Sequence, residues 1–223
     1  MIKIISIDAA TKSLAIACLE FNNIYQQIEE IIKLIKTNFN ESTLEKCNEI
    51  LNPINIKSLD VIDLIPNQKV SKCNIIEISY ELMKYIHNFT KNLQECKWFD
   101  NSVHIVIEYQ MGPNRKSGDI QTQLIYHFLQ FLPIKNIHII RPSLKNKLYF
   151  PKDINSQHNS HIERYKKKYT GNKSHTKYIF IQWLTAYNKL NYIKNINKKN
   201  YADIADAFCQ ANAWYLENIN PTK

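Results

Sequence analysis

The stretch VHIVIEYQ (103–110) constrains the fold more than any other part of the chain. Its apolar residues follow one another almost without interruption, which is typical of a strand that is covered on both faces. Strands of that kind lie in the middle of α/β sheets, between layers of helices. We therefore expect an α/β protein in which helices cover the faces of a sheet.

The remaining periodicity predicts four further strands and five helices. Short β-branched runs predict strands at 2–8, 13–21, 56–65 and 137–142, and apolar residues at helical spacing predict helices at 24–50, 74–95, 120–132, 174–189 and 200–217. Residues 111–119 and 143–172 are predicted to be loops. Two adjacent strands followed by strands that helices separate predict a mixed five-stranded sheet. We expect one domain over residues 1–223, with a helical insertion at about 22–55 after the second strand.

Composition narrows the class of protein. Hydrophobic residues make up 44% of the chain, which is enough for a core, and no apolar run approaches the roughly 20 residues of a membrane span. Because MIKIISID lacks the features of a secretory signal, we expect a soluble intracellular protein without a membrane partner. Three glycines leave no room for a Gly-rich nucleotide-binding fingerprint, so no nucleotide cofactor is expected. The five cysteines have no C-x-x-C spacing, which argues against a zinc or redox motif.

The charge distribution indicates a polyanionic partner. The net charge is +9, from 29 Lys and Arg against 20 Asp and Glu. The segment RYKKKYTGNKSHTK (164–177) is strongly basic and contains no acid. Such a segment is typical of a surface that neutralises nucleic-acid phosphates. The alternative is a solvated basic loop with no partner.

Four carboxylates stand where a sheet would bring them together. Asp8 ends the first predicted strand and Glu108 ends the clearest one, while Asp203 and Asp206 lie three residues apart on one face of the last helix. Acids on a face that packs against a sheet are costly to desolvate unless a cation compensates them. Mg²⁺ or Mn²⁺ takes such oxygen ligands. Four carboxylates suit two ions about 3.5–4 Å apart, as used for phosphodiester cleavage. Taken singly, each acid is equally compatible with a turn or a solvated surface.

Three segments carry a resemblance to a known family. IISIDAATKSLAIACLE, VHIVIEYQMGPNRKSG and YADIADAFCQANAWYL resemble the three acidic motifs of the RuvC-type Holliday junction resolvases, in particular those of poxviruses and related large DNA viruses. The resemblance covers residues 1–21 and roughly 56–217. It implies a ribonuclease H-like fold, a homodimer, a need for Mg²⁺ and symmetric cutting of four-way DNA junctions. It also implies the host cytoplasm as location, if the protein is viral.

The same resemblance implies roles for individual residues. Asp8, Glu108, Asp203 and Asp206 match the metal-binding acids. The family has a catalytic lysine at the start of the helix before the last, for which Lys177, the third residue after the predicted N-cap Ser174, is preferred over Lys173. The residues expected to contact DNA phosphates are the basic ones of the segment and of the loop after Glu108, namely Arg115, Lys116, Arg164, Lys166, Lys167, Lys168 and Lys173.

Two other functions remain open from the sequence. One is a different ribonuclease H-like nuclease, such as a ribonuclease H or a transposase-like enzyme. The other is a non-catalytic nucleic-acid-binding protein whose acids are structural. The insertion at 22–55 has no counterpart in compact members of the resolvase family, so the arrangement of subunits stays open as well.

Overall fold

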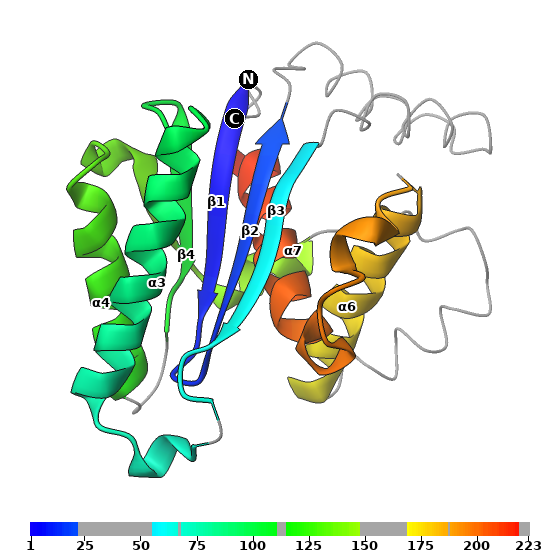
Figure 1. The fold of residues 1–223 in the computed structure, drawn as a ribbon. Coiled ribbons are helices and arrows are strands. Elements are labelled where there is room, and N and C mark those ends of the chain that lie inside the picture. Colours follow the sequence, from blue (N-terminus) through cyan, green and yellow to red (C-terminus); the bar gives the residue numbers. More distant parts are fainter. Residues whose placement is uncertain (22–54, 67, 111–114, 148–168, 187, 219–223) are drawn as a thin grey trace, which may run out of the picture.

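Five strands form one mixed sheet in the computed structural model, which describes residues 1–21, 55–66, 68–110, 115–147, 169–186 and 188–218. The strands are β1 (Ile2–Ala9), β2 (Ser13–Phe21), β3 (Asn55–Asp63), β4 (Val103–Glu108) and β5 (Ile137–Ile140), in the spatial order β3-β2-β1-β4-β5 (Figure 1). β2 runs antiparallel to β1 and β3, whereas β1, β4 and β5 are parallel. The predicted mixed sheet is confirmed. The predicted insertion lies outside the described residues, except for its last residue, which begins β3.

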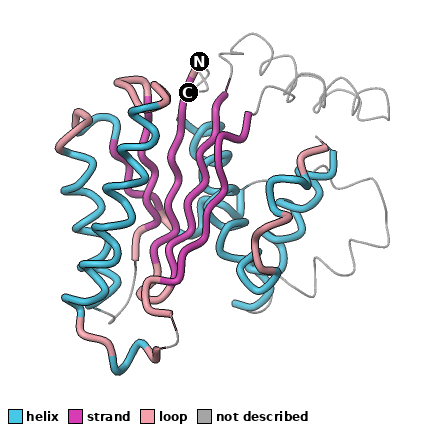
Figure 2. Tube along the Cα trace, viewed as in Figure 1, coloured by secondary structure: helices cyan, strands magenta, loops and turns pink. Residues whose placement is uncertain are grey.

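Helices cover both faces of this sheet (Figures 1 and 2). α3 (Ile75–Glu95) and α4 (Arg115–Leu129) lie on one face, while α7 (Tyr201–Asn218) lies on the other and α6 (Tyr169–Ala186) packs on α7. Short 3-10 helices complete the chain: η1 (Val70–Lys72), η2 (Ile134–Asn136), η3 (Pro142–Lys147), η4 (Leu190–Ile193) and η5 (Lys198–Asn200). Among the described helices, none combines the length and the apolar character that crossing a membrane requires.

α3 forms where the sequence supplies both a start signal and an apolar stripe. Asn74 and Glu77 make a capping box. The Asn74 side chain accepts a hydrogen bond from the backbone of the first turn, and the Glu77 side chain accepts one from the Asn74 backbone N–H. Ile78, Leu82 and Ile86 recur every four residues and are fully buried against the sheet. The helix predicted at 74–95 is therefore confirmed.

α7 is deeply buried against the sheet. Every residue from Ile204 to Tyr215 is buried. Aromatic pairs fix it in place: Phe208 meets Phe180 of α6 with ring centroids 5.1 Å apart, and Tyr215 stacks on Phe21 of β2 at 4.1 Å. Because the helix is surrounded by protein, its polar side chains must find partners within the fold.

The start of α4 differs from the prediction. The helix begins at Arg115, within the stretch predicted to be a loop, rather than at residue 120. Tertiary hydrogen bonds hold the first two turns of α4: the hydroxyls of Ser117 and Thr11 are 3.0 Å apart in a buried position, and the Gln110 backbone N–H donates to Gln121 Oε1 at 3.0 Å. These partners come from outside the helix, so the local pattern could not indicate them.

The start of α6 also differs from the prediction. The helix begins at Tyr169, so Ser174 lies in its second turn and is not its N-cap. A serine marks a helix start only weakly, because its hydroxyl is also tolerated within a helix, where it bonds to the preceding turn or to solvent. Within the predicted loop 143–172, residues up to Lys147 belong to η3.

Candidate active site

The register of the sheet places Asp8 and Glu108 on neighbouring strands. Ile7 of β1 pairs with Ile107 of β4, so the acid that follows each of them stands at the same level of the sheet. Side chains alternate between the two faces of a strand. Since Ile7 and Ile107 pack on the α3 and α4 side, Asp8 and Glu108 point to the opposite side, toward α7.

The last helix brings the other two acids to the same place. Asp206 is 2% exposed, whereas Asp203, one turn earlier, keeps part of its surface. The Ser13 hydroxyl at the start of β2 donates to Asp203 Oδ2 at 3.3 Å, which ties the helix to the β1–β2 turn. Asp206 lies deeper, between α7 and the sheet, and has several partners of its own.

The pKa of Asp8 is affected by all three of the other acids, so the four share one site. Burial is the largest influence and, with the neighbouring charges of Glu108, Asp206 and Asp203, it raises the pKa of Asp8 to about 8. Lys145 acts in the opposite direction without cancelling this rise. In the metal-free protein, Asp8 therefore keeps its proton to a much higher pH than an ordinary aspartate does. The structure thus brings together the four acids that the sequence singled out.

Lys145 lies within this cluster, and it was not among the residues predicted from the sequence. Its Nζ donates to Asp206 Oδ2 at 2.6 Å and to Glu108 Oε2 at 3.1 Å, and its side chain is 10% exposed. Burial by itself lowers the pKa of this lysine, but the carboxylates of Asp206 and Glu108 outweigh burial, so the pKa is raised. Lys145 is therefore a firmly charged ammonium that neutralises part of the acidic cluster.

Lys145 sits in η3, directly after β5, in a region predicted to be a loop. In a chain with 29 Lys and Arg, no local pattern separates this lysine from the others. Its neighbour Leu144 is buried, which fixes the path of η3 across the site.

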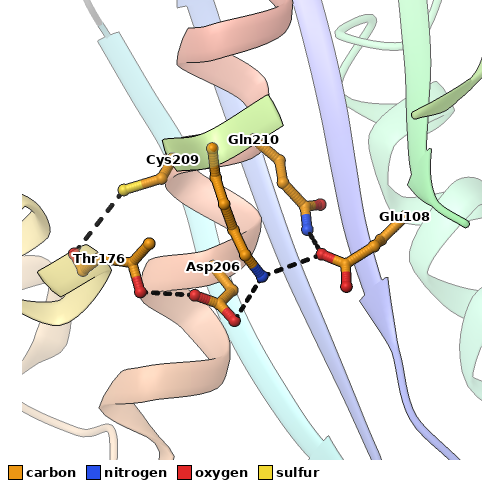
Figure 3. Close-up of polar contacts among 6 residues, drawn as sticks. Glu108, Thr176, Asp206, Cys209 and Gln210 are labelled. Atoms are coloured by element: carbon orange, nitrogen blue, oxygen red, sulfur yellow. Dashed lines mark hydrogen bonds and ion pairs between the residues drawn. The ribbon is translucent and has the colours of Figure 1, made fainter. Parts of the chain in front are cut away.

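Two uncharged side chains orient the carboxylates. The Thr176 hydroxyl of α6 donates to Asp206 Oδ1 at 2.6 Å, and the Gln210 amide donates to Glu108 Oε2, the oxygen that Lys145 also contacts (Figure 3). Both Thr176 and Gln210 are fully buried. The Cys209 thiol in turn donates to the Thr176 backbone oxygen at 3.7 Å, which joins α7 to α6. These contacts hold Asp206 and Glu108 in defined orientations.

The donor set suits a hard divalent cation, although the cluster is closed around Lys145. Carboxylate oxygens are the ligands that Mg²⁺ and Mn²⁺ prefer. The buried Gln210 Oε1 has no hydrogen-bond partner within the described part of the chain, so it can accept a further hydrogen bond. Within the same residues, no three His, Cys, Asp or Glu side chains are arranged as ligands of one metal. The residues therefore fit the cation chemically, with an ammonium standing between two of them.

The two predicted catalytic lysines both belong to α6. Lys177 is exposed on α6, and its Nζ stands 5.8 Å from the centre of the Tyr201 ring, a cation–π contact. Lys173 falls in the same helix, in a turn whose side chains are outside the described ones. Because α6 begins at Tyr169, Lys177 is not in the first turn of its helix, on which its preference relied, whereas a role for Lys173 stays a prediction.

The predicted DNA-contacting residues divide into three groups, apart from Lys173, whose side chain lies outside the described ones. Arg115 is exposed at the first turn of α4. Lys116 is partly buried and its Nζ donates to the Cys73 backbone oxygen at 2.7 Å, so this ammonium has an internal partner. Arg164, Lys166, Lys167 and Lys168 lie outside the described residues.

Comparison with known proteins identifies the fold. A structure of T. thermophilus RuvC in complex with a Holliday junction substrate matches with a TM-score of 0.51 and 7% identity, over 98% of each chain. The chain has a ribonuclease H-like fold. A fowlpox virus resolvase in complex with its substrate Holliday junction DNA matches with a TM-score of 0.49 and 14% identity, over 96% of each chain. No family model and no curated protein matches the sequence.

The ribonuclease H-like fold accounts for the position of the site. The parallel strands β1 and β4 end side by side at the middle of the sheet, and α7 crosses the same face. Acids at these two strand ends and on this helix converge, although nearly 200 residues separate Asp8 from Asp206 in the sequence. The convergence is a property of the topology, because the carboxyl ends of parallel strands share one edge of the sheet.

Proposed function

We propose that this protein is a metal-dependent, structure-specific endonuclease that resolves four-way DNA junctions by paired phosphodiester hydrolysis. The observation that carries the proposal is the convergence of Asp8, Glu108 and the Asp203–Asp206 pair on one face of a ribonuclease H-like sheet. Four acids in a partly desolvated cluster are unfavourable in a merely structural role. They are useful where cations and phosphates meet.

The four acids would hold Mg²⁺ or Mn²⁺, with two ions in each site as the proposed number. When bound, such ions activate water and stabilise the leaving oxygen of a phosphodiester. The protein's own contribution is to orient the carboxylates: Thr176 fixes Asp206, Gln210 fixes Glu108, and Ser13 restrains Asp203. Orientation of this kind is what keeps a ligand set in place between turnovers.

Branched DNA is the proposed substrate, and a homodimer the proposed form. The net charge of +9 and the acid-free segment at 164–177 favour a phosphate backbone as partner. A four-way junction has two symmetric strands to cut, so a twofold dimer with one site in each subunit matches the two cuts. One domain per subunit, covering residues 1–223, completes the proposal.

A second candidate is a non-catalytic DNA-binding protein with the same fold. Lys145 favours it, because an ammonium bonded to both Asp206 and Glu108 already neutralises part of the cluster without any metal. In that case the acids and Lys145 would form a structural ion network. The two candidates differ in whether added Mg²⁺ or Mn²⁺ produces cleavage.

One assay separates these functions. The purified protein is incubated with a synthetic four-way junction, a linear duplex or an RNA–DNA hybrid, each with Mg²⁺, with Mn²⁺ or with EDTA. We expect metal-dependent, paired nicking of the junction alone. Cleavage of the hybrid would instead indicate a ribonuclease H, and strand joining a transposase-like enzyme. Junction binding without cleavage in either metal would support the non-catalytic candidate.

Variants test the assignment of the site. Asp8→Asn and Asp206→Asn are expected to abolish junction cleavage while retaining junction binding, since they remove proposed ligands and leave the basic surface intact. Glu81→Gln is the matched control, because Glu81 is an exposed acid on α3, on the other face of the sheet. Wild-type nicking by either Asp variant in Mg²⁺ would disprove the assignment.

A further inference from the structure

We propose that Lys145 is a resident cation of the metal site: its ammonium takes the place of a divalent ion in the metal-free protein and must withdraw before that ion binds. This inference rests on the proposed function, because it presumes that the acidic cluster is a metal site. The inference is that the Lys145 ammonium competes with the divalent ion and thereby lowers the metal affinity of the site.

The geometry leaves one place for two cations. The Lys145 Nζ bridges Asp206 Oδ2 and Glu108 Oε2, which come from α7 and β4. A Mg²⁺ ion lies about 2.0–2.1 Å from each oxygen ligand. An ion bound to these same two oxygens would overlap the position of the ammonium. Lys145 and a bridging divalent ion therefore exclude one another.

Burial shows that the position of Lys145 is a response to the acids. Within the described part of the chain, Lys145 is the only lysine that is buried, at 8% exposure, and Asp206 is the only buried carboxylate residue, at 2%. A lysine is costly to desolvate, and it is buried only where anions compensate that cost. The ammonium is thus drawn into the site by the charges that would otherwise attract a metal.

The structure also provides for the departure of Lys145. The side chain is a flexible four-carbon chain with a strongly hydrated head group, and it belongs to a 3-10 helix rather than to a strand of the sheet. The bonds from Thr176 to Asp206 and from Gln210 to Glu108 do not involve Lys145. Both carboxylates therefore keep an orienting partner when the ammonium leaves, so the ligand set persists for the incoming ion.

The test measures metal affinity rather than cleavage. Mn²⁺ is titrated by calorimetry into the full-length, metal-free wild type, Lys145→Met and Lys145→Arg, with free Mn²⁺ followed by electron paramagnetic resonance. Removal of the competing charge is expected to tighten Mn²⁺ binding by about tenfold or more in Lys145→Met. Lys145→Arg keeps the charge and should bind more weakly than Lys145→Met. Lys84→Met, at an exposed lysine of α3, is the matched control and should bind like the wild type.

A second measurement uses the wild type alone, so that a variant that fails to fold does not leave the inference untested. Lysine amines are labelled chemically and quantified by mass spectrometry, with and without Mg²⁺. Lys145 should be protected in the metal-free protein and become labelled when Mg²⁺ is added, whereas the labelling of Lys84 should not change. Protection that persists at saturating Mg²⁺ would overturn the inference.

The outcomes separate this inference from the proposed function. If the wild type binds Mn²⁺ and cleaves junctions but Lys145→Met binds no more tightly, only the competition by Lys145 is disproved. If neither protein binds Mn²⁺ or Mg²⁺, the metal site itself is disproved, and the inference falls with it. Tighter binding by Lys145→Met, together with metal-dependent labelling of Lys145, would establish the inference.

Discussion

Asp206→Asn provides a quantitative test of the charge network. The substitution keeps the shape of the side chain but removes its charge. Asp206 accepts two short hydrogen bonds, from Lys145 Nζ and from the Thr176 hydroxyl, each at 2.6 Å. The amide oxygen of an asparagine can still accept from Thr176, so the principal loss is the charged bond to Lys145. Lys145 keeps Glu108 as its remaining partner, at 3.1 Å.

The expected cost follows from these contacts. A hydrogen bond to a charged group contributes about 1.5–3 kcal/mol, and leaving a buried ion without its partner costs about 3–5 kcal/mol. Because Glu108 still compensates Lys145, the lower part of the second range applies, and we expect the free energy of unfolding to fall by about 3 kcal/mol. For a chain of this size, that corresponds to a decrease of about 6–12 °C in Tm.

Urea unfolding of the metal-free protein in EDTA at pH 7, followed by tryptophan fluorescence, measures this change. The three tryptophans include Trp214 on α7, the helix that carries Asp206. Glu81→Gln removes an exposed partner of Lys84 at 3.8 Å and should change the free energy of unfolding by no more than about 0.5 kcal/mol. A loss below about 1 kcal/mol in Asp206→Asn would show that the Lys145–Asp206 pair does not stabilise the fold, and would refute the reasoning.

Three other predictions concern pH, orientation and DNA. Because the pKa of Asp8 is raised to about 8, this side chain keeps a proton in the native metal-free protein that it loses in the unfolded chain above about pH 4, so its contribution to stability should decrease as pH rises from about 4 to 8. Unfolding curves across this window should therefore show that the stability of the wild type relative to that of Asp8→Asn decreases as pH rises, and a difference independent of pH would contradict the shift. Gln210→Leu removes the hydrogen bond from the side-chain amide to Glu108. It should lower metal affinity in titrations, or the rate of junction cleavage, about 10–100-fold, whereas wild-type values would exclude an orienting role. Alanine at the three lysines of 166–168 should weaken junction binding and flatten its salt dependence, measured by fluorescence anisotropy at several salt concentrations, and an unchanged salt slope would remove them from the DNA surface.

The sequence by itself determined the elements and the positions of the four acids along them. An uninterrupted apolar run indicated β4, and the recurrence of apolar residues every three to four positions indicated α3. Asp8 and Glu108 end their runs, and Asp203 and Asp206 share a helix face. All of these are local signals, since burial on one or both faces of an element imposes its own period on the residues.

Only the tertiary structure determined that the Lys145 ammonium binds two of those acids, and where two helices begin. The first turn of α4 depends on a hydroxyl contact between Ser117 and Thr11, which are 106 residues apart. Among many lysines, Lys145 is the one that contacts Glu108 and Asp206, because η3 passes beside a central strand and the last helix. The physical reason is the same in both cases: the stabilising partner is distant in sequence, so no local pattern carries its signal, and it acts only once the sheet and α7 have come together.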